Sequence, residues 1–179
     1  MSLIKAATYT AQCRAWCAHL NKTVYKGDVR VSHFSQVCTK LSNKEYLVAA
    51  LTDFNLQPEV FDTPQPLRGY YGSFGEYSAE IIVYGRTIHA HADIGFRWNQ
   101  IDGVYELIHD SYETIPRFGS NFFTHRLLEK YGEHAIRAKA TQLEEKLGAC
   151  TITPIPTETG HTLKLTFAAH QQMQQYQRR

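Results

Sequence analysis

The feature that most constrains the fold is a pair of runs rich in aromatic and β-branched residues, separated by a polar break. The first run covers residues 92–98 (ADIGFRW), and the second covers residues 103–108 (GVYELI). The break, from Asn99 to Gly103, has the composition of a turn. Two such runs on either side of a turn predict a β-hairpin.

The predicted hairpin carries Asp93, Arg97 and Glu106 among apolar neighbours. Buried charges are normally paired, because an unpaired charge is costly to remove from water. Asp93 and Arg97 are four residues apart and share a face of a strand, and Glu106 on the returning strand can lie opposite Arg97. The pattern favours an ion-pair network, completed by Arg68 or Arg126, that fixes the register of the sheet.

Two functional alternatives to this network stay open. One is a cleft lined by Glu80, Asp93 and Glu106, and the other is a surface that docks a partner. Acid–base catalysis in such a cleft needs two carboxylates with separated pKa values, which a sequence does not reveal. His33 and His134 are further polar candidates, although both are more typical of capping or core hydrogen bonds than of general bases.

The overall composition is that of an ordinary globular domain. Of the 179 residues, 43% are apolar and 20% are charged, and 19 basic against 17 acidic residues give a net charge of +2. This balance is too even to indicate nucleic-acid binding by electrostatics. No run reaches the ~18 apolar residues that a membrane helix needs, so we expect no transmembrane segment; peripheral membrane association stays open.

Cysteine and histidine spacing gives no strong metal motif and no disulfide framework. The four cysteines are Cys13, Cys17, Cys38 and Cys150. Cys13 and Cys17 share a face if residues 3–20 are helical, and His89 and His91 share a face if they lie in a strand. Each pair lacks further ligands in reach, and no phosphate-binding glycine loop or nucleophile elbow is present. We therefore predict no metal and no cofactor.

Residues 43–54 are predicted to form an amphipathic helix. Ser42 and Glu45 match a capping box, and apolar residues follow at helical spacing. Among these, Leu47 and Leu51 are expected to be buried.

Two more helices are expected in the second half of the chain, with Gly132 at their junction and Gly148 at the end of the second. The apolar residues that define them are Phe118, Phe122, Leu127 and Tyr131, followed by Ile136, Ala140, Leu143 and Leu147. Ile136 and Leu143 are expected to be buried.

The remaining strands are short and separated by turn residues. They are expected at residues 59–61, where prolines limit the length, and at residues 79–84, 149–155 and 162–167. Strands joined by hairpins rather than crossovers predict an α+β fold, with an antiparallel sheet, a central β-hairpin, and helices packed on one face.

The first 27 residues contain no Asp or Glu, although they include several Lys and Arg residues. This composition is typical of an organellar targeting peptide, and an ordinary N-terminal helix is the alternative. Tyr9, Trp16 and Tyr25 are of the residue type that anchors protein interfaces. The expected organisation is a basic extension over residues 1–31, a single α+β domain over 32–168 and a polar tail over 169–179.

Several short motifs in order resemble one known family over about residues 32–167. They are Ser32-His33-Phe34-Ser35, Arg68-Gly69-Tyr70, Ala79-Glu80-Ile81, Asp93 to Arg97, Tyr105-Glu106-Leu107, and Tyr131 with His134. The family is that of hypothetical chloroplast open reading frame thirty-five, a cyanobacterial and plastid domain of unknown function. The resemblance implies an organellar protein, with a plastid favoured and a mitochondrion as the alternative, and it implies no reaction.

These observations favour a non-catalytic accessory, structural or assembly subunit of a larger organellar protein complex. Its contacts with other subunits are expected through the N-terminal extension and the C-terminal tail. The alternative is a small-molecule enzyme or ligand-binding domain with a carboxylate-lined site on the hairpin face, around Asp93, Glu106 and Arg68.

Overall fold

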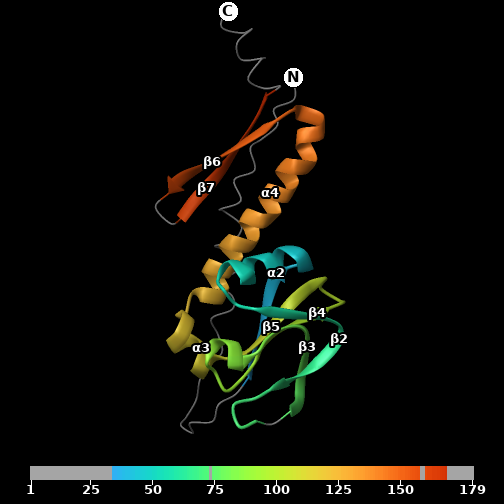
Figure 1. The fold of residues 1–179 in the computed structure, drawn as a ribbon, viewed down its shortest axis with the longest axis vertical. Coiled ribbons are helices and arrows are strands. Elements are labelled where there is room, and N and C mark those ends of the chain that lie inside the picture. The colour runs from blue at the N-terminus through green and yellow to red at the C-terminus, as the bar shows by residue number, and fades with distance from the viewer. Residues whose placement is uncertain (1–33, 73, 158–159, 169–179) are drawn as a thin grey trace, which may run out of the picture. The chain divides into compact units, whose positions relative to one another are not determined.

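The protein's structure, a computed structural model, describes residues 34–72, 74–157 and 160–168 (Figure 1). Some of the predicted residues lie outside this part of the chain. They are the interface residues Tyr9, Trp16 and Tyr25, the cysteines Cys13 and Cys17, the polar candidate His33, and the tail over residues 169–179.

A five-stranded antiparallel sheet forms the centre of the described chain, in the strand order β1-β5-β4-β3-β2. Its strands are β1 (Phe34–Leu41), β2 (Pro58–Arg68), β3 (Phe74–Val83), β4 (Ile94–Asn99) and β5 (Val104–Asp110). Strands β4 and β5 form the predicted hairpin, in which Arg97 lies opposite Glu106. The spacing of the two apolar runs therefore predicted the register correctly.

Helices and a second, two-stranded sheet complete the described fold, which confirms the α+β class. The helical segments are α2 (Lys44–Asp53), the 3₁₀-helix η1 (Gly85–Ile88), α3 (Ser111–Phe118), the π-helix η2 (Phe122–Arg126) and α4 (Leu127–Leu147). The second sheet pairs β6 (Cys150–Thr157) with β7 (Gly160–Phe167). Both strands lie against α4, beside its C-terminal half (Figure 1).

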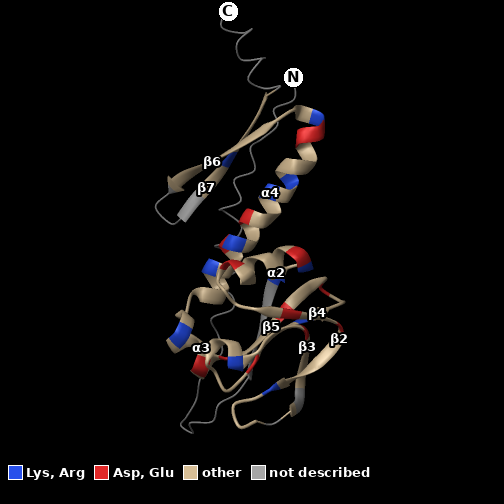
Figure 2. Ribbon diagram, viewed as in Figure 1, with Lys and Arg blue, Asp and Glu red and all other residues tan. Residues whose placement is uncertain are grey.

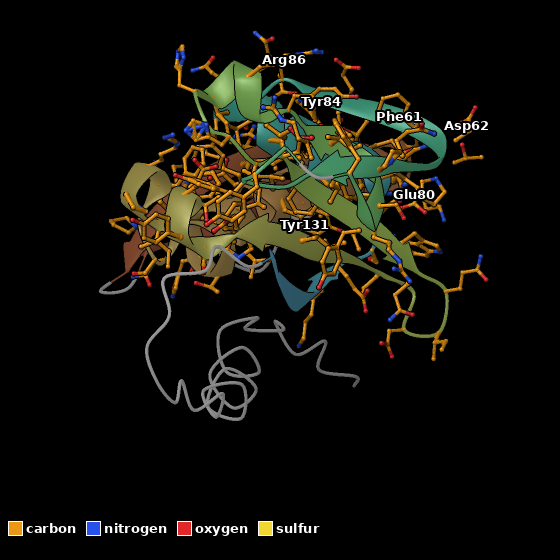
Figure 3. All side chains as sticks on the ribbon, turned by 90° about the horizontal axis from the view of Figure 1, so that it is seen from below. Phe61, Asp62, Glu80, Tyr84, Arg86 and Tyr131 are labelled. Carbon is orange, nitrogen blue, oxygen red and sulfur yellow. The ribbon has the colours of Figure 1, made fainter. Side chains whose placement is uncertain are left out.

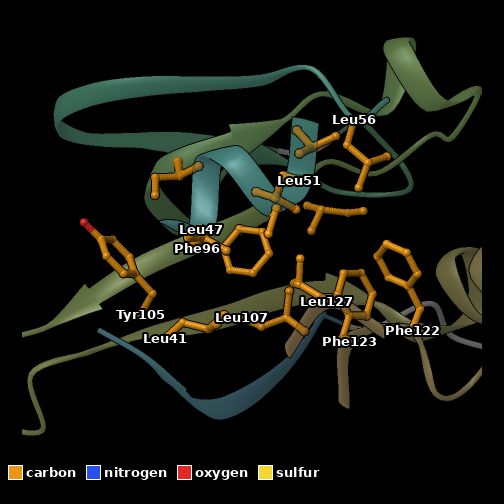
Figure 4. Packing of buried hydrophobic residues seen from close by; sticks show 14 residues of the cluster. Leu41, Leu47, Leu51, Leu56, Phe96, Tyr105, Leu107, Phe122, Phe123 and Leu127 are labelled. Carbon is orange, nitrogen blue, oxygen red and sulfur yellow. The ribbon is translucent and has the colours of Figure 1, made fainter. Parts of the chain in front are cut away.

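One face of the five-stranded sheet packs under α2, η2 and the start of α4 (Figure 4). The cluster includes Leu47 and Leu51 from α2, Phe96 from β4 and Leu127 from α4, each of them 0% exposed. Full burial of such a side chain contributes about 1.5–3 kcal/mol of hydrophobic free energy. This cluster is the main core, and it confirms the predicted burial of Leu47 and Leu51.

The opposite face is covered by the bent strand β2, whose pairing with β3 shifts register twice. Leu67 at the end of β2 packs in a second cluster with Ala79, Ile82 and Ile108. A Cβ on Gly95 would lie 2.6 Å from Leu67 Cδ1 and 2.8 Å from Ala79 Cβ. The glycine in the middle of β4 therefore lets β2 close over the sheet.

Two predictions about the first half of the domain are wrong in detail. The N-cap of α2 is Asn43 rather than Ser42, and its side chain accepts a hydrogen bond from the Tyr46 amide at 2.9 Å. Asn caps a helix as well as Ser does. The strand expected at residues 59–61 extends over the whole of β2 despite its prolines, because β2 is an edge strand and prolines are tolerated there.

The predicted helix junction at Gly132 is also wrong, because α4 continues through this residue. The break occurs earlier, at Gly119, whose φ of +86° ends α3. Gly148 ends α4 as predicted. Ile136 and Leu143 are half-buried rather than buried; the C-terminal half of α4, which includes Leu143, packs beside the small β6–β7 sheet.

Candidate functional site

Asp93 joins three backbone segments immediately before β4, where its side chain is 3% exposed. Its Oδ2 accepts a hydrogen bond from the backbone N–H of Arg68 at 2.9 Å, and its Oδ1 accepts one from the N–H of Gly85 at 2.8 Å. The Asp93 N–H donates to the Arg68 carbonyl at 2.9 Å. The partners of this carboxylate are therefore backbone amides, and the predicted ion pair with an arginine side chain is not what holds it.

Glu113, in the first turn of α3, is a second buried carboxylate and was not singled out from the sequence. Its Oε2 accepts hydrogen bonds from the backbone N–H groups of His91 and Ala92 at 2.8 and 2.7 Å. Helix α3 carries both acidic and basic residues (Figure 2). Arg117, in its last turn, lies 3.9 Å from Glu113 Oε1 and donates to the His89 carbonyl. The only sequence signal is an i,i+4 Glu–Arg pair, which is common on exposed helices.

These two carboxylates fix the segment over residues 85–93, which links β3 to β4. The segment begins with η1, and His89 follows with a φ of +55°. A Cβ on Gly85 would lie 2.6 Å from the carbonyl oxygens of Ala90 and Ala92, so the turn is tightly closed. His89 and His91 therefore do not share a face of a strand, and the metal-chelating alternative for this pair loses its geometric basis.

A small hollow opens beside this segment, lined by Arg68, Tyr70, Gly72 and His91. Arg68 ends β2, and Tyr70 lies in the turn between β2 and β3, which is closed by a hydrogen bond from the Gly72 N–H to the Gly69 carbonyl at 2.9 Å. The Tyr70 and His91 rings meet edge to face, with centroids 5.0 Å apart. The hollow is thus built from two chain segments that the Asp93 carboxylate joins.

Large apolar side chains are exposed on the two elements that flank the hollow. Tyr71 and Phe74, at the β2–β3 turn, are 73% and 66% exposed, and Tyr112 and Ile115 on α3 are 65% and 48% exposed. Aromatic residues are enriched in protein interfaces. We call these four residues, three of which are aromatic, the aromatic surface.

The other predicted polar residues lie at the far end of β4. The Glu80 carboxylate accepts a hydrogen bond from the Trp98 N–H at 2.8 Å, and Glu106 accepts one from the Asn99 side chain at 2.7 Å. Arg97 is exposed. Asp93 and Glu106 are about 13 Å apart along the strand direction, at ~3.3 Å per residue. The structure therefore does not gather Glu80, Asp93 and Glu106 into one cleft.

Tyr131 and His134 of α4 contact the two ends of α2. The Tyr131 hydroxyl accepts hydrogen bonds from the backbone N–H groups of Ser42 and Asn43 at 3.2 and 2.9 Å. His134 Nε2 lies 2.9 Å from Asp53 Oδ2 in the last turn of α2. This partly exposed side-chain pair joins two helices, and it is neither the helix cap nor the core hydrogen bond that the sequence favoured for His134.

His109 on β5 is a buried titratable group that sequence reasoning missed. Thr114 Oγ1 donates to the Asp110 carbonyl at 2.8 Å, so it accepts from His109 Nδ1, which lies 2.7 Å away. Burial lowers the pKa of His109 to about 4. The imidazole is therefore neutral at physiological pH and fixes the start of α3 to the sheet.

Arg86, in the fixed segment but outside the hollow, has partners of its own. Its guanidinium lies 4.4 Å from the centroid of the Tyr84 ring (Figure 3) and 3.6 Å from Glu59 Oε1. Burial, together with the negative charge of Glu59, raises the pKa of Tyr84. Arg86 is thus a suitable control for Arg68.

Two searches of the described residues found no further site. No group of three or more His, Cys, Asp or Glu side chains could hold a metal ion. Among the helices of residues 34–168 that the structure describes, none is both long and apolar enough to cross a membrane.

Fold and site together define an antiparallel α+β domain with a loop anchored by two buried carboxylates. A sequence model described as "Protein of unknown function (DUF1257)" matches residues 50–153, which is more than half of the chain and includes Arg68, Asp93 and Glu113. The chain belongs to this family. No curated protein and no solved structure matches it.

Proposed function

We propose that the protein is a non-catalytic accessory, structural or assembly subunit of a larger protein complex in an organelle. The observation that carries this proposal is the aromatic surface, which is exposed on elements whose backbone Asp93 and Glu113 hold in place. Exposed apolar side chains next to an anchored backbone require less ordering of the chain when a partner covers them. The aromatic surface is therefore suited to bind another protein.

The partners of the acidic side chains also favour this function over an enzyme with a carboxylate-lined site. Asp93 and Glu113 use both of their oxygens to accept backbone N–H groups. Such hydrogen bonds stabilise the charged form, which disfavours proton transfer. No carboxylate lines the described hollow.

The resemblance in the ordered motifs supports the cellular setting. We take the family to be that of hypothetical chloroplast open reading frame thirty-five, with cyanobacterial and plastid members. The acid-free composition of the first 27 residues supports import into a plastid, with a mitochondrion as the alternative. Tyr9, Trp16 and Tyr25, and the polar tail, then supply contacts to the complex in addition to the aromatic surface.

The test is purification of the tagged full chain from its native source. The double variant Tyr71→Ser, Tyr112→Ser is expected to leave the complex, because it removes two exposed rings without touching the core. Ile101→Ser is the matched control, since Ile101 is 95% exposed in the turn at the far end of β4. The proposal fails if the wild-type chain purifies alone, or if the double variant and the control are retained equally.

A second arm separates the extension from the aromatic surface. Deletion of residues 2–27 is expected to leave the domain folded and to weaken its retention in the complex. Retention at normal stoichiometry would show that the extension serves only for targeting.

A further inference from the structure

The hollow beside the fixed segment has the size of a chemical group rather than of a whole metabolite. Its volume is about 90 Å³, and its lining is Arg68, Tyr70, Gly72 and His91. One water needs roughly 10–15 Å³ of such space, whereas pockets for drug-sized ligands measure about 300–1,000 Å³. The hollow can therefore receive one polar head group of a larger molecule, or a small ion.

Three polar side chains line this hollow without using their hydrogen-bonding groups. Within the part of the chain that the structure describes, the Arg68 guanidinium, the Tyr70 hydroxyl and the His91 ring nitrogens make no hydrogen bond or ion pair. Their backbones are nevertheless held, since Arg68 N–H donates to Asp93 and His91 N–H donates to Glu113. These side chains therefore stand on an anchored backbone and have no acceptor among the described residues.

The two buried carboxylates that bind these backbone segments have other partners than the Arg68 side chain. Both oxygens of Asp93 and both oxygens of Glu113 accept backbone N–H groups, and Arg117 adds a charge partner to Glu113. The Arg68 guanidinium in the hollow therefore has no ion-pair partner among the described acidic residues. A planar guanidinium matches the spacing of two oxygens in a phosphate or a carboxylate.

We infer that this hollow is an oxyanion-binding site, in which Arg68 holds a phosphoryl or carboxylate group and Tyr70 and His91 donate further hydrogen bonds. The site is independent of the proposed place in a complex, since it is complete within one chain. Its oxyanion is the phosphoryl or carboxylate group of a small molecule.

The site can be tested by titrating the full chain at constant ionic strength with inorganic phosphate in one arm and acetate in the other. Binding is followed by calorimetry and by the NMR shifts of the amides of residues 68–72 and 91. Saturable binding of at least one probe is expected, with shifts confined to these amides. Phosphate alone would assign a phosphoryl group, and acetate alone would assign a carboxylate.

Three variants decide whether the hollow is responsible. Arg68→Gln is expected to weaken binding about tenfold or more, because a hydrogen bond to a charged group is lost. Tyr70→Phe is expected to weaken binding by about twofold to tenfold. Arg86→Gln is the matched control and is expected to bind like the wild type.

The inference is overturned if neither probe saturates, or if Arg68→Gln and Arg86→Gln bind the probes equally. Arg68→Gln is expected to fold, because Asp93 binds the backbone N–H of Arg68 rather than its side chain. Should Arg68→Gln fail to fold, Tyr70→Phe carries the test, and unchanged binding by that variant is then the contrary outcome. Failure of this test leaves the docking function of the aromatic surface untouched.

Discussion

The acidic residues at the two ends of β4 have different partners. At the start, Asp93 is 3% exposed and accepts two backbone N–H groups from chain segments that are distant in sequence. At the far end, Glu106 is half-buried and accepts from the side chain of Asn99, in the adjoining turn. Asp93 therefore connects segments that are distant in sequence, whereas Glu106 makes a local contact within the hairpin.

This difference shows which end of β4 the buried acidic residues stabilise. At the end that carries the hollow, Asp93 and Glu113 bind backbone N–H groups, and His109 binds the Thr114 hydroxyl, which itself donates to the Asp110 carbonyl. An anchored backbone at this end suits the proposed docking function, because a surface that is already ordered loses less conformational entropy on association. The far end, with exposed Arg97 and Ile101, has no comparable network of buried acids among the described residues.

The largest effect expected from this comparison is that of Asp93→Ala. It leaves the N–H groups of Arg68 and Gly85 without their acceptor, at about 1–3 kcal/mol each, so the free energy of unfolding should fall by on the order of 4 kcal/mol. Glu106→Ala is the matched control and should change the free energy of unfolding by less than about 1 kcal/mol. The Asn99 side chain keeps its other hydrogen bond in this variant, from Nδ2 to Asp102 Oδ2 at 3.0 Å. Urea unfolding measures both, and equal losses would contradict the comparison.

A pH effect of about 3 kcal/mol is expected from His109. Its pKa is about 4 in the folded state and 6.5 in the reference state, so the unfolded chain binds the proton first as the pH falls. Stability from this group is therefore complete above pH 6.5 and is lost between pH 6.5 and 4. Urea midpoints across this range should fall less in His109→Gln than in the wild type.

The control for this titration is His125→Gln, because His125 is exposed. It should keep the full pH dependence of the wild type. If the wild type and His109→Gln differ by the same amount at pH 7.5 and pH 4.5, the buried imidazole does not contribute as proposed.

The close contact between β2 and β4 predicts a smaller loss. Gly95→Ala places a Cβ 2.6 Å from Leu67 Cδ1, and overpacking of this kind costs about 1–3 kcal/mol. In a Leu67→Ala background the clash with Leu67 is removed, whereas the 2.8 Å approach to Ala79 Cβ remains, so the same substitution should cost less but still destabilise. A double-mutant cycle from thermal melts measures the coupling between positions 95 and 67. Additive losses would argue against the packing of Leu67 on Gly95.

Periodicity was enough to predict the parts of the fold that depend on local pattern. The hairpin of β4 and β5, the helix α2 and the paired strands β6 and β7 all follow from apolar spacing and turn residues. The full length of strand β2 could not be predicted, because its three prolines argue against a strand unless it is known to lie at an edge. Edge position is a property of the whole sheet.

The candidate site was predicted only in part, for a similar reason. Asp93 was conspicuous as a charge in an apolar run, but its partners are amides of Arg68 and Gly85, which have no characteristic side-chain spacing. Glu113 gave no signal, because its acceptor role depends on the turn at His91. Arg68 and Tyr70 belong to one motif that was identified from the sequence, and His91 was considered only as a metal-binding pair with His89.

The smallest expected effect concerns Arg97 and Glu106, the pair that the hairpin places opposite each other. Arg97 is exposed, and cross-strand or surface charge pairs contribute roughly 0.2–1 kcal/mol. A cycle of Arg97→Ala and Glu106→Ala should therefore give a coupling of about 0.5 kcal/mol that decreases at high salt. A coupling several times larger, insensitive to salt, would mean that the far end of β4 also holds a structural charge network, and the contrast between its two ends would not stand.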